Sequence, residues 1–459
     1  MTPILTAAEM RAAEDRAMAQ GTSVDTLMQQ AGEAVAAKVA AHAGSGDDVL
    51  VLCGPGNNGG DGYVAAASLL ASGVAVRVAC SAPPATDVAR RARAQWTGEV
   101  VMIEDAEPGA VVVDALFGTG LSRALDPAAA GPLARLVEAA RWSLAVDLPS
   151  GVDSDTGALL SPAPAFAATL ALGALKPAHL LSPAAGLMGE IEVADIGVAV
   201  ASHLQALARP RLNPPGPADH KYTRGLVTVV GGAMPGAAAL AALGAARGGA
   251  GYVQLLVPER TPGLPHAIVQ RPFTEAALLA AAIGDTRIGA VVIGPGLGHS
   301  EMARSAVAVA LASGRPLVID ADALSLVEDA ITAPAILTPH EGEFARLFGD
   351  LPGTRWERAR AAARATGAVV VLKGSNSVVA APDGRAALSR PLPPGLATAG
   401  TGDVLAGLGG TMLAQMGDPF AAACAAVWIH GDAACTLPAP FIADDLASPA
   451  LGAAVARCW

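Results

Sequence analysis

The sequence has little charge, little lysine and little cysteine, and it lacks a long run of large apolar residues. Only 15% of its 459 residues are charged whereas 52% are hydrophobic, so the chain has the apolar content of folded cores and not of a disordered protein. Thirty basic residues stand against 41 acidic ones, and the net charge of −11 argues against nucleic acid and anionic membrane as partners. A phosphate-bearing ligand would therefore need a local device, such as a Gly-rich loop at a helix N-terminus.

No segment has the composition of a membrane span or of a secretory signal. The longest uncharged run, residues 225–246, is long enough to span a bilayer but consists mainly of Gly and Ala, which add little to insertion energy. The N-terminal stretch MTPILTAAEMRAAEDR has acidic residues and no apolar core of a signal peptide. The five cysteines show no CxxC spacing, which indicates ordinary thiols in a reducing compartment. We therefore expect a cytoplasmic protein.

Lysine is rare enough to be informative. The 30 basic residues include only four lysines, Lys38, Lys176, Lys221 and Lys373. A chain that uses arginine almost everywhere else reflects a codon bias, and lysines that survive it are candidates for positions where a guanidinium cannot substitute. Lys38 lies in a helical surface pattern, where chance explains it. For the other three, the surrounding motif decides.

Hydrophobic periodicity divides the chain into two α/β halves. The first forty residues show helical periodicity, and from residue 48 short apolar strands that end in Gly-rich or acidic turns alternate with helices. Continuous apolar strands of this kind are typical of a parallel sheet covered on both faces. The stretch ARPRLNPPGPADHK, with four prolines, is the best linker candidate. We therefore predict a domain at residues 1–210, a linker at 211–220 and a second domain at 221–459.

Three strand ends in the first half carry Gly-rich or oxygen-rich residues. GPGNNGGDG follows one strand and precedes a helix expected at residues 63–72, and its glycines would let backbone N–H groups approach an anion. Asp114 and Asp147 end two apolar strands, with Asn58 and Ser150 close in topology. Ligands of open α/β sheets bind at the carboxyl ends of the strands. Such an oxygen-rich cluster suits a cation or a general base, whereas a plain turn or helix cap would need fewer polar residues.

The motifs TAAEMRAAEDR, LMQQAG, GPGNNGGDG, DALFGTG and DLPSG resemble the epimerase domain of the NAD(P)H-hydrate repair enzymes, over nearly all of residues 1–210. The resemblance implies a Rossmann-like three-layer α/β fold, K⁺ ligands at Asn58, Asp114 and Ser150, and catalytic roles for Asp147 and Lys176. It implies a site for hydrated NADH or NADPH. The implied substrate-binding residues are Asn57, Asn58, Gly59, Gly60, Asp61, Gly118, Thr119, Gly120, Leu121, Ser122, Arg123, Ala124 and Asp147.

GTGDVLAG, at residues 400–407, is the strongest signal in the second half. Gly400, Thr401 and Gly402 would place consecutive N–H groups at a helix N-terminus, where they could stabilise a phosphoryl group in transfer. Asp403, in the first turn, could take a proton from an attacking hydroxyl, although an Asp there is also common as a simple helix stabiliser. GPGLG, TPHEGE and LKGSNS also close apolar strands. We therefore expect four loops to converge on one rim.

This half resembles the ribokinase-like superfamily and, more narrowly, the ADP-dependent NAD(P)H-hydrate dehydratases. The resemblance implies transfer of the nucleotide's terminal phosphoryl group to the C6 hydroxyl of the hydrate, after which loss of phosphate restores the double bond, with Mg²⁺ shielding the charges. The residues leave ADP and ATP open, and the resemblance implies ADP. The implied hydrate contacts are Ala237, Gly296, His340 and Asp403, with Asp403 also catalytic. The implied nucleotide contacts are Lys373, Gly374, Ser375, Asn376, Ser377 and Gly402.

Three functions remain to be compared. A bifunctional repair enzyme would interconvert the R and S forms of hydrated NAD(P)H and dehydrate the S form. A small-alcohol kinase of hydroxymethylpyrimidine or thiazole type, fused to a nucleotide-binding domain, would release a stable phosphorylated alcohol. A non-enzymatic interaction module would have no use for Asp114, Asp147 and the NNGGD loop together. The first function is our prediction, for a homo-oligomer that acts on small molecules.

Overall fold

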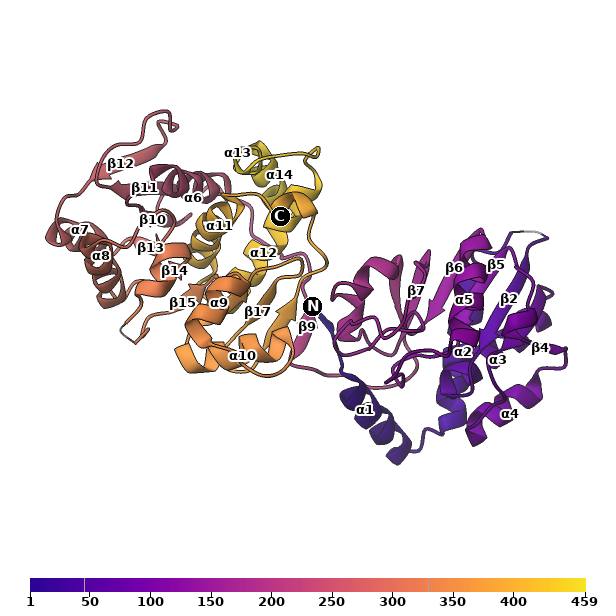
Figure 1. The fold of residues 1–459 in the computed structure, drawn as a ribbon. Coiled ribbons are helices and arrows are strands. Elements are labelled where there is room, and N and C mark those ends of the chain that lie inside the picture. The colour runs from indigo at the N-terminus through magenta and orange to yellow at the C-terminus, as the bar shows by residue number, and fades with distance from the viewer. Residues whose placement is uncertain (45, 329) are drawn as a thin grey trace. The chain divides into compact units, whose positions relative to one another are not determined.

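The computed structural model describes residues 1–44, 46–328 and 330–459, and its contacts divide into two compact units (Figure 1). The first unit is Thr2–Gln205, and the second is Ala206–Trp459 together with Met1. The boundary therefore lies just before the Pro-rich stretch, and residues 211–220 belong to the second unit by their contacts.

The first unit is built on a parallel sheet with the strand order β4-β3-β2-β5-β6-β7-β8. From β2 the chain moves outward to β3 and β4, then returns to β5 on the other side of β2. The strand order thus reverses between β2 and β5, the place where open α/β sheets bind ligands. The strands of this sheet are β2 (Asp48–Cys53), β3 (Ala75–Cys80), β4 (Val100–Met102), β5 (Val111–Ala115), β6 (Trp142–Val146), β7 (Ala168–Leu172) and β8 (Glu190–Ala194), whereas β1 (Thr2–Pro3) and β9 (Leu204–Ala206) are not part of it. The helices are α1 (Ala7–Ala19), α2 (Val24–Ala40), α3 (Asn57–Ala71), α4 (Asp87–Gln95) and α5 (Pro127–Ala139), with short 3₁₀ turns η1 (Ile103–Asp105), η2 (Pro177–His179) and η3 (Ala184–Leu187).

Close packing explains the glycines after β2 and corrects one boundary. Helix α3 begins at Asn57, six residues before the predicted start, so the NNGGD segment forms its first turns. A Cβ on Gly59 would lie 1.8 Å from the Gly54 carbonyl oxygen, and a Cβ on Gly60 would lie 2.4 Å from the Met28 side chain. These glycines are therefore required by the packing of α3 against its own loop and against α2, which outweighs the poor helix propensity of glycine.

The second unit has a mixed sheet in which β12-β11-β10-β13-β14-β15-β16 are parallel and the β17-β18 hairpin continues antiparallel. The strand order reverses between β10 and β13. The strands are β10 (Leu226–Val230), β11 (Tyr252–Val257), β12 (Ile268–Pro272), β13 (Ile288–Ile293), β14 (Leu317–Ile319), β15 (Ala335–Leu337), β16 (Val369–Leu372), β17 (Val378–Ala380) and β18 (Ala386–Leu388). The helices are α6 (Pro235–Arg247), α7 (Ala276–Ile283), α8 (Glu301–Ala312), α9 (Glu341–Phe348), α10 (Arg355–Thr366), α11 (Thr401–Met416), α12 (Pro419–Cys435), α13 (Ala443–Leu446) and α14 (Pro449–Ala456), with 3₁₀ turns η4 (Ala321–Leu326) and η5 (Pro394–Leu396).

Helices α6 and α11 lie side by side at very short range (Figure 1). A Cβ on Gly407 would lie 1.8 Å from the Ala241 carbonyl oxygen, and a Cβ on Gly244 would lie 2.5 Å from the Val404 carbonyl oxygen. Glycine and alanine at this contact let the two backbones touch. The uncharged run 225–246 is therefore a buried strand followed by a packed helix, and among the described residues no helix is long and apolar enough to cross a membrane.

Candidate active sites

Polar side chains of the first unit meet at the reversal point of its sheet. Helix α3 starts directly beyond β2 and presents Asn58, while Gly118 follows β5 and Asp147 follows β6. A Cβ on Gly118 would lie 2.9 Å from Asp147 Oδ2 and 3.1 Å from Asn58 Oδ1, so both side chains face the same glycine. The amide nitrogen of Asn58 is buried and makes no hydrogen bond. An oxygen atom of a bound ligand could accept a hydrogen bond from this amide.

Asp114, the fourth residue of β5, is fully buried among neutral donors. Its Oδ1 accepts hydrogen bonds from Leu116 N and Ser150 Oγ, and its Oδ2 accepts one from Ser150 N, at 2.8–3.1 Å. Within the described part of the chain no basic side chain pairs with Asp114, and burial raises its pKa to about 6 despite these bonds. A buried carboxylate without a counterion is costly, and a bound cation would relieve the cost.

Asp147 and Lys176 form a buried ion pair. Lys176 Nζ donates to Asp147 Oδ1 and to the Leu172 carbonyl, and Thr119 N donates to Asp147 Oδ2. Burial opposes the charge of Asp147, but the Lys176 ammonium outweighs it and holds the pKa of that carboxyl below its ordinary value. Asp147 also has φ +65°, a left-handed conformation that is rare outside glycine. The pair is thus charged, shielded from water and held in a strained geometry.

Two more carboxyls act on this ion pair electrostatically. Burial raises the pKa of Asp61 well above its usual range, and the charges of Asp147 and Glu14 raise it further. Burial likewise raises the pKa of Glu14, which comes from α1. Asp61 therefore favours its protonated form beside a carboxylate that favours ionisation, an arrangement suited to proton transfer. Sequence reasoning missed Glu14 because it lies within an ordinary amphipathic helix.

The remaining predicted residues of the first unit are less closely gathered. Asn57 is exposed, and its amide oxygen accepts a hydrogen bond from Thr86, which caps α4. Of the loop predicted to bind substrate, Thr119 contacts Asp147, whereas Gly120 is exposed. The loop residues farther from the aspartate are all at least partly exposed, namely Leu121, Ser122, Arg123 and Ala124.

The corresponding cluster of the second unit lies at the start of α11. Gly400 caps this helix with φ +91°, so Thr401, Gly402 and Asp403 form its first turn. A Cβ on Gly402 would lie 3.3 Å from Lys373 Nζ, which donates at 2.8 Å to the buried Asp320. The helix N-terminus therefore faces a partly exposed ammonium group, and the two together suit an anion.

Burial and neighbouring charges determine the pKa of Asp403. Burial raises the pKa of Asp403 to about 7, with Asp320 raising it further and Lys373 opposing them. Burial opposes the charge of Lys373, but Asp320 outweighs it and raises the pKa of that amine. A carboxyl whose pKa lies near neutrality is suited to general-base chemistry at neutral pH. Sequence reasoning missed Asp320, although it follows an apolar strand as Asp147 does.

The loops after β15 and β16 join the same rim. His340 and Lys373 form a parallel backbone bridge, and His340 caps α9 by accepting hydrogen bonds at Nδ1 from Gly342 N and Glu343 N. Its side chain is about half exposed, at 55%. The cap occupies Nδ1, and Nε2 lies 3.5 Å from Glu343 Oε1, so a ligand that binds at Nε2 would share this nitrogen with the Glu343 carboxylate.

The loop after β16 divides into exposed and structural residues. Gly374 and Ser375 are exposed, whereas Asn376 and Ser377 are buried and bond to the β18 end at Ser389. Arg355, from α10, holds this loop by donating to the carbonyls of Leu372, Lys373 and Asn376. Sequence reasoning missed Arg355 because α10 is rich in arginine and shows the pattern of a solvated surface.

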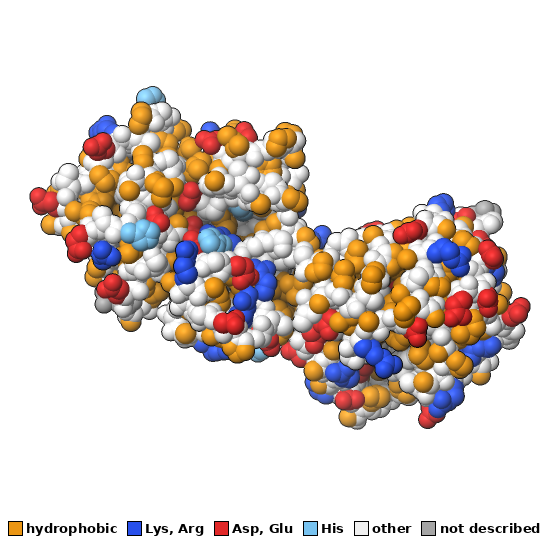
Figure 2. Space-filling view, viewed as in Figure 1, with side chains coloured by type: hydrophobic (Ala, Val, Ile, Leu, Met, Phe, Trp, Pro, Cys, Tyr) orange, Lys and Arg blue, Asp and Glu red, His pale blue; other side chains and the backbone are white. Residues whose placement is uncertain are grey.

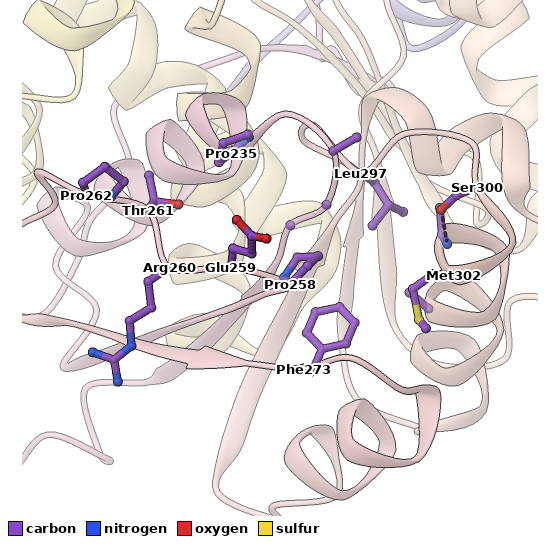
Figure 3. Close-up of a pocket in the computed structure, with 15 residues that line it drawn as sticks. Pro235, Pro258, Glu259, Arg260, Thr261, Pro262, Phe273, Leu297, Ser300 and Met302 are labelled. Carbon is purple, nitrogen blue, oxygen red and sulfur yellow. Dashed lines mark hydrogen bonds between the residues drawn. The ribbon is translucent and has the colours of Figure 1, made fainter.

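A cavity of about 580 Å³ opens beside the loops that follow β10, β11 and β13. Figure 3 shows Pro258, Phe273 and Leu297 around it, while Arg260 extends away from them. Ala237 and Gly296 meet close by, since a Cβ on Gly296 would lie 3.1 Å from Ala237 Cβ. Gly296 has φ +63°, and its carbonyl accepts a hydrogen bond from Met234 N. The visible face of this unit also shows acidic, basic and histidine side chains around a hollow (Figure 2).

Replacing Gly402 with valine is expected to raise the KM for ADP about tenfold, equivalent to about 1.4 kcal/mol. The new side chain would displace Lys373 Nζ and cover the N–H groups of the first turn. Steady-state kinetics with varied ADP measure the change. Gly236→Val is the control, because Gly236 holds the same second position in α6 and a Cβ there meets nothing within 4 Å. Equal KM values for the two variants would contradict the nucleotide site.

Comparison with known proteins bears on both units. A family described as "YjeF-related protein N-terminus" matches residues 24–178, and one described as "NAD(P)H-hydrate dehydratase" matches residues 227–455. A protein of Gloeobacter violaceus named "Bifunctional NAD(P)H-hydrate repair enzyme Nnr" is 38% identical, covering 93% of this chain and 92% of the relative. The protein of that name from Mycobacterium tuberculosis is 37% identical, covering 81% of this chain and 79% of the relative.

Solved structures resemble the second unit. A ribokinase-like superfamily protein of Enterococcus faecalis matches with a TM-score of 0.51 and 23% identity, over 57% of this chain and 98% of that one, which shows the fold. An ADP/ATP-dependent NAD(P)H-hydrate dehydratase of Bacillus subtilis, co-crystallised with ATP and Mg²⁺, matches with a TM-score of 0.47 and 32% identity, over 54% of this chain and 95% of that one. From its two domains and its near full-length relatives, the chain belongs to the family of bifunctional NAD(P)H-hydrate repair enzymes.

Proposed function

We propose that the first unit epimerises hydrated NAD(P)H at C6 and that the second unit dehydrates the S form with ADP as phosphoryl donor, releasing AMP and phosphate. The observation that carries the proposal is the presence of two separate charge clusters, a buried one in the first unit and a partly buried one in the second, each at the reversal point or loop rim of its own sheet. Asp147 and Lys176 form the first cluster, and Asp320, Lys373 and Asp403 form the second.

The chemistry of C6 explains what the first cluster can do. This carbon bears both the hydroxyl and the ring nitrogen N1, so it is a hemiaminal carbon. Loss of the hydroxyl proton lets the C6–N1 bond open to an aldehyde while N1 takes a proton, and closure on the other face returns the opposite epimer. No C–H bond breaks and no oxidant is needed. The Asp147 carboxylate can accept the hydroxyl proton, and Asp61, whose pKa burial raises, is the candidate to supply one to N1.

A second group of residues in the first unit fits a monovalent cation. Asn58, Asp114 and Ser150 offer oxygen atoms, and Asp114 is a buried carboxylate that lacks a basic partner in the described chain. No group of three or more His, Cys, Asp or Glu side chains among the described residues could hold a metal ion, so the site lacks the donors of a transition-metal centre. When bound, K⁺ would supply the positive charge that the buried carboxylate needs.

Replacing K⁺ with tetramethylammonium is expected to slow epimerisation about tenfold, equivalent to about 1.4 kcal/mol. Asp114→Asn keeps the size of the side chain but removes its charge, so this variant should be slow in either salt. Asp105→Asn, an exposed carboxyl of the same unit, is the control and should keep the response to K⁺. A wild-type rate that is indifferent to the cation would remove K⁺ from the proposal.

In the second unit, phosphorylation converts the C6 hydroxyl into a good leaving group. Asp403 would take the hydroxyl proton as the oxygen attacks the terminal phosphorus of ADP, and AMP leaves. Loss of phosphate from C6 with the C5 proton then restores the double bond. Mg²⁺ would arrive on the nucleotide phosphates, where one or two protein carboxylates suffice, and it would neutralise their charge. The N–H groups at the start of α11 and Lys373 stabilise the remaining negative charge.

The pKa of about 7 for Asp403 gives the pH dependence of dehydration a sign. A general base must be ionised, so kcat/KM for the S hydrate should rise with pH and level off above about 7. The rate of epimerisation should not rise in this pH range, because Lys176 holds the pKa of Asp147 below its ordinary value. Initial rates measured in constant ionic strength buffers test this, and a dehydration profile that is flat through neutrality would argue against Asp403 as the base.

One mixture tests the whole proposal against a small-alcohol kinase. The protein is incubated with hydrated NADH, ADP and Mg²⁺, and the absorbance of the dihydronicotinamide ring is followed. Recovery of absorbance with stoichiometric AMP and phosphate supports repair. A phosphorylated alcohol that accumulates without recovered NADH would support the kinase instead.

A further inference from the structure

His179 contacts both members of the Asp147–Lys176 ion pair and has no assigned role. It ends the turn η2 and is fully buried. Its Nε2 is 2.7 Å from the Asp147 carbonyl oxygen, and its Nδ1 is 2.8 Å from Lys176 N. One imidazole ring therefore contacts the backbones of both members of the ion pair.

The partners fix the tautomer of this ring. A carbonyl oxygen only accepts, so Nε2 must carry the proton and donate to Asp147; a backbone N–H only donates, so Nδ1 must accept from Lys176. The Lys176 carbonyl lies farther from Nδ1, at 3.2 Å. Burial lowers the pKa of His179 to about 4, so the ring adds no charge beside the ion pair.

The bond to Asp147 acts on a strained residue. Leu148 N donates to the Val146 carbonyl at 2.8 Å across Asp147, closing a three-residue turn whose central φ is +65°. Such turns are rare and are kept only when their surroundings hold them. The Asp147 N–H is held by the Leu170 carbonyl and the Asp147 carbonyl by His179. With both ends of the peptide fixed, the carboxylate is directed at Lys176 and Thr119.

We infer that His179 is a positioning residue for epimerisation, which holds Asp147 in its left-handed turn and Lys176 against it without contacting the substrate. The inference rests on the proposed epimerase activity of the first unit. It adds to the proposed activity the residue that holds Asp147 and Lys176 in position.

Three substitutions test the inference. His179→Phe keeps a ring but loses both bonds, His179→Gln can keep the donor to Asp147, and His179→Asn can keep the acceptor for Lys176. For His179→Phe we expect kcat of epimerisation to fall about tenfold to a hundredfold, with smaller losses in the other two. The KM for the hydrate and dehydration of the S form by the same chain should stay within about twofold of wild type. His42→Gln is the control, because His42 is a partly buried histidine of the same unit that stacks on Trp142.

A spectroscopic measurement on the wild-type chain decides the matter if the variants fold poorly. With ¹⁵N-labelled histidine, His179 should show the neutral Nε2–H form throughout the range from about pH 5 to 8. A neutral Nδ1–H form, an unchanged kcat in His179→Phe, or a raised KM with unchanged kcat would overturn the inference. If the wild-type chain itself fails to epimerise, the proposed function fails, whereas an active wild type with an equally active His179→Phe variant refutes the inference alone.

Discussion

Dehydration of the S hydrate by the Asp403→Asn variant is expected to be slower than wild type by at least ~10²-fold. Asparagine keeps the size of the side chain and its place in the first turn of α11, but it cannot accept the hydroxyl proton. The nucleotide contacts that we propose at Gly402 and Lys373 are unchanged, so ADP should still bind. Single-turnover rates with the S hydrate measure the first effect, and calorimetric titration with ADP measures the second.

Loss of a carboxylate from a helix N-terminus also weakens the helix, and this effect needs a control. Asp87 lies in the first turn of α4 and is exposed, so Asp87→Asn removes a comparable charge from a helix of the other unit. This control should leave dehydration unchanged. Near-native turnover by Asp403→Asn would show that another group takes the proton.

The second large effect concerns Asp147 and separates the two activities. Hydration creates a stereocentre at C6, and a pocket that aligns one hydroxyl with a phosphoryl donor accepts only one epimer. With a mixed pool of epimers and excess ADP, Asp147→Asn should repair the accepted fraction at the normal rate and then continue only at the rate of spontaneous inversion. Asparagine is preferred to alanine here because it tolerates the left-handed φ of +65°. Recovered NADH followed over time gives both phases.

The opposite variant provides the control for this experiment. Asp403→Asn should still interconvert the epimers, as chromatography of the two forms would show, but should return no reduced nucleotide. Asp147→Asn leaves the buried Lys176 without its counterion, which costs stability in the first unit, so circular dichroism of the variant is needed to check that this unit remains folded. Complete rapid repair by Asp147→Asn would mean that Asp147 is not needed for inversion.

Much of the fold and of the site geometry follows from the rule that ligands of open α/β sheets bind at the carboxyl ends of the strands. Asp114 and Asp147 end apolar strands of a parallel sheet, and such ends share one edge. The structure places Asp147 and Asn58 against the same glycine and bonds Asp114 to Ser150. The family match covers both units, and the α/β class predicted from periodicity is confirmed.

The remainder depends on tertiary contacts that a sequence pattern does not contain. NNGGD was predicted as a loop whose glycines let backbone N–H groups approach an anion, whereas in the structure close packing against α2 requires glycine within α3. His179 contacts Asp147 only because η2 returns the chain to the end of β6. Arg355 reaches from a helix with a solvated pattern back to the carbonyls of the β16 loop.

The glycine contact between α6 and α11 has a mechanical consequence. Helix α6 begins at Pro235, which lines the cavity, and α11 begins at Thr401, followed by Gly402 and Asp403, so the two helices carry residues of both proposed ligand sites. With backbones this close, we expect that neither helix can slide or tilt without the other. Any closure of this unit around its ligands must therefore hinge elsewhere, in loops such as the exposed turn at Gly374. If hydrate and phosphoryl donor bind at these two helix starts as we propose, the contact between the helices holds the two sites at a fixed separation.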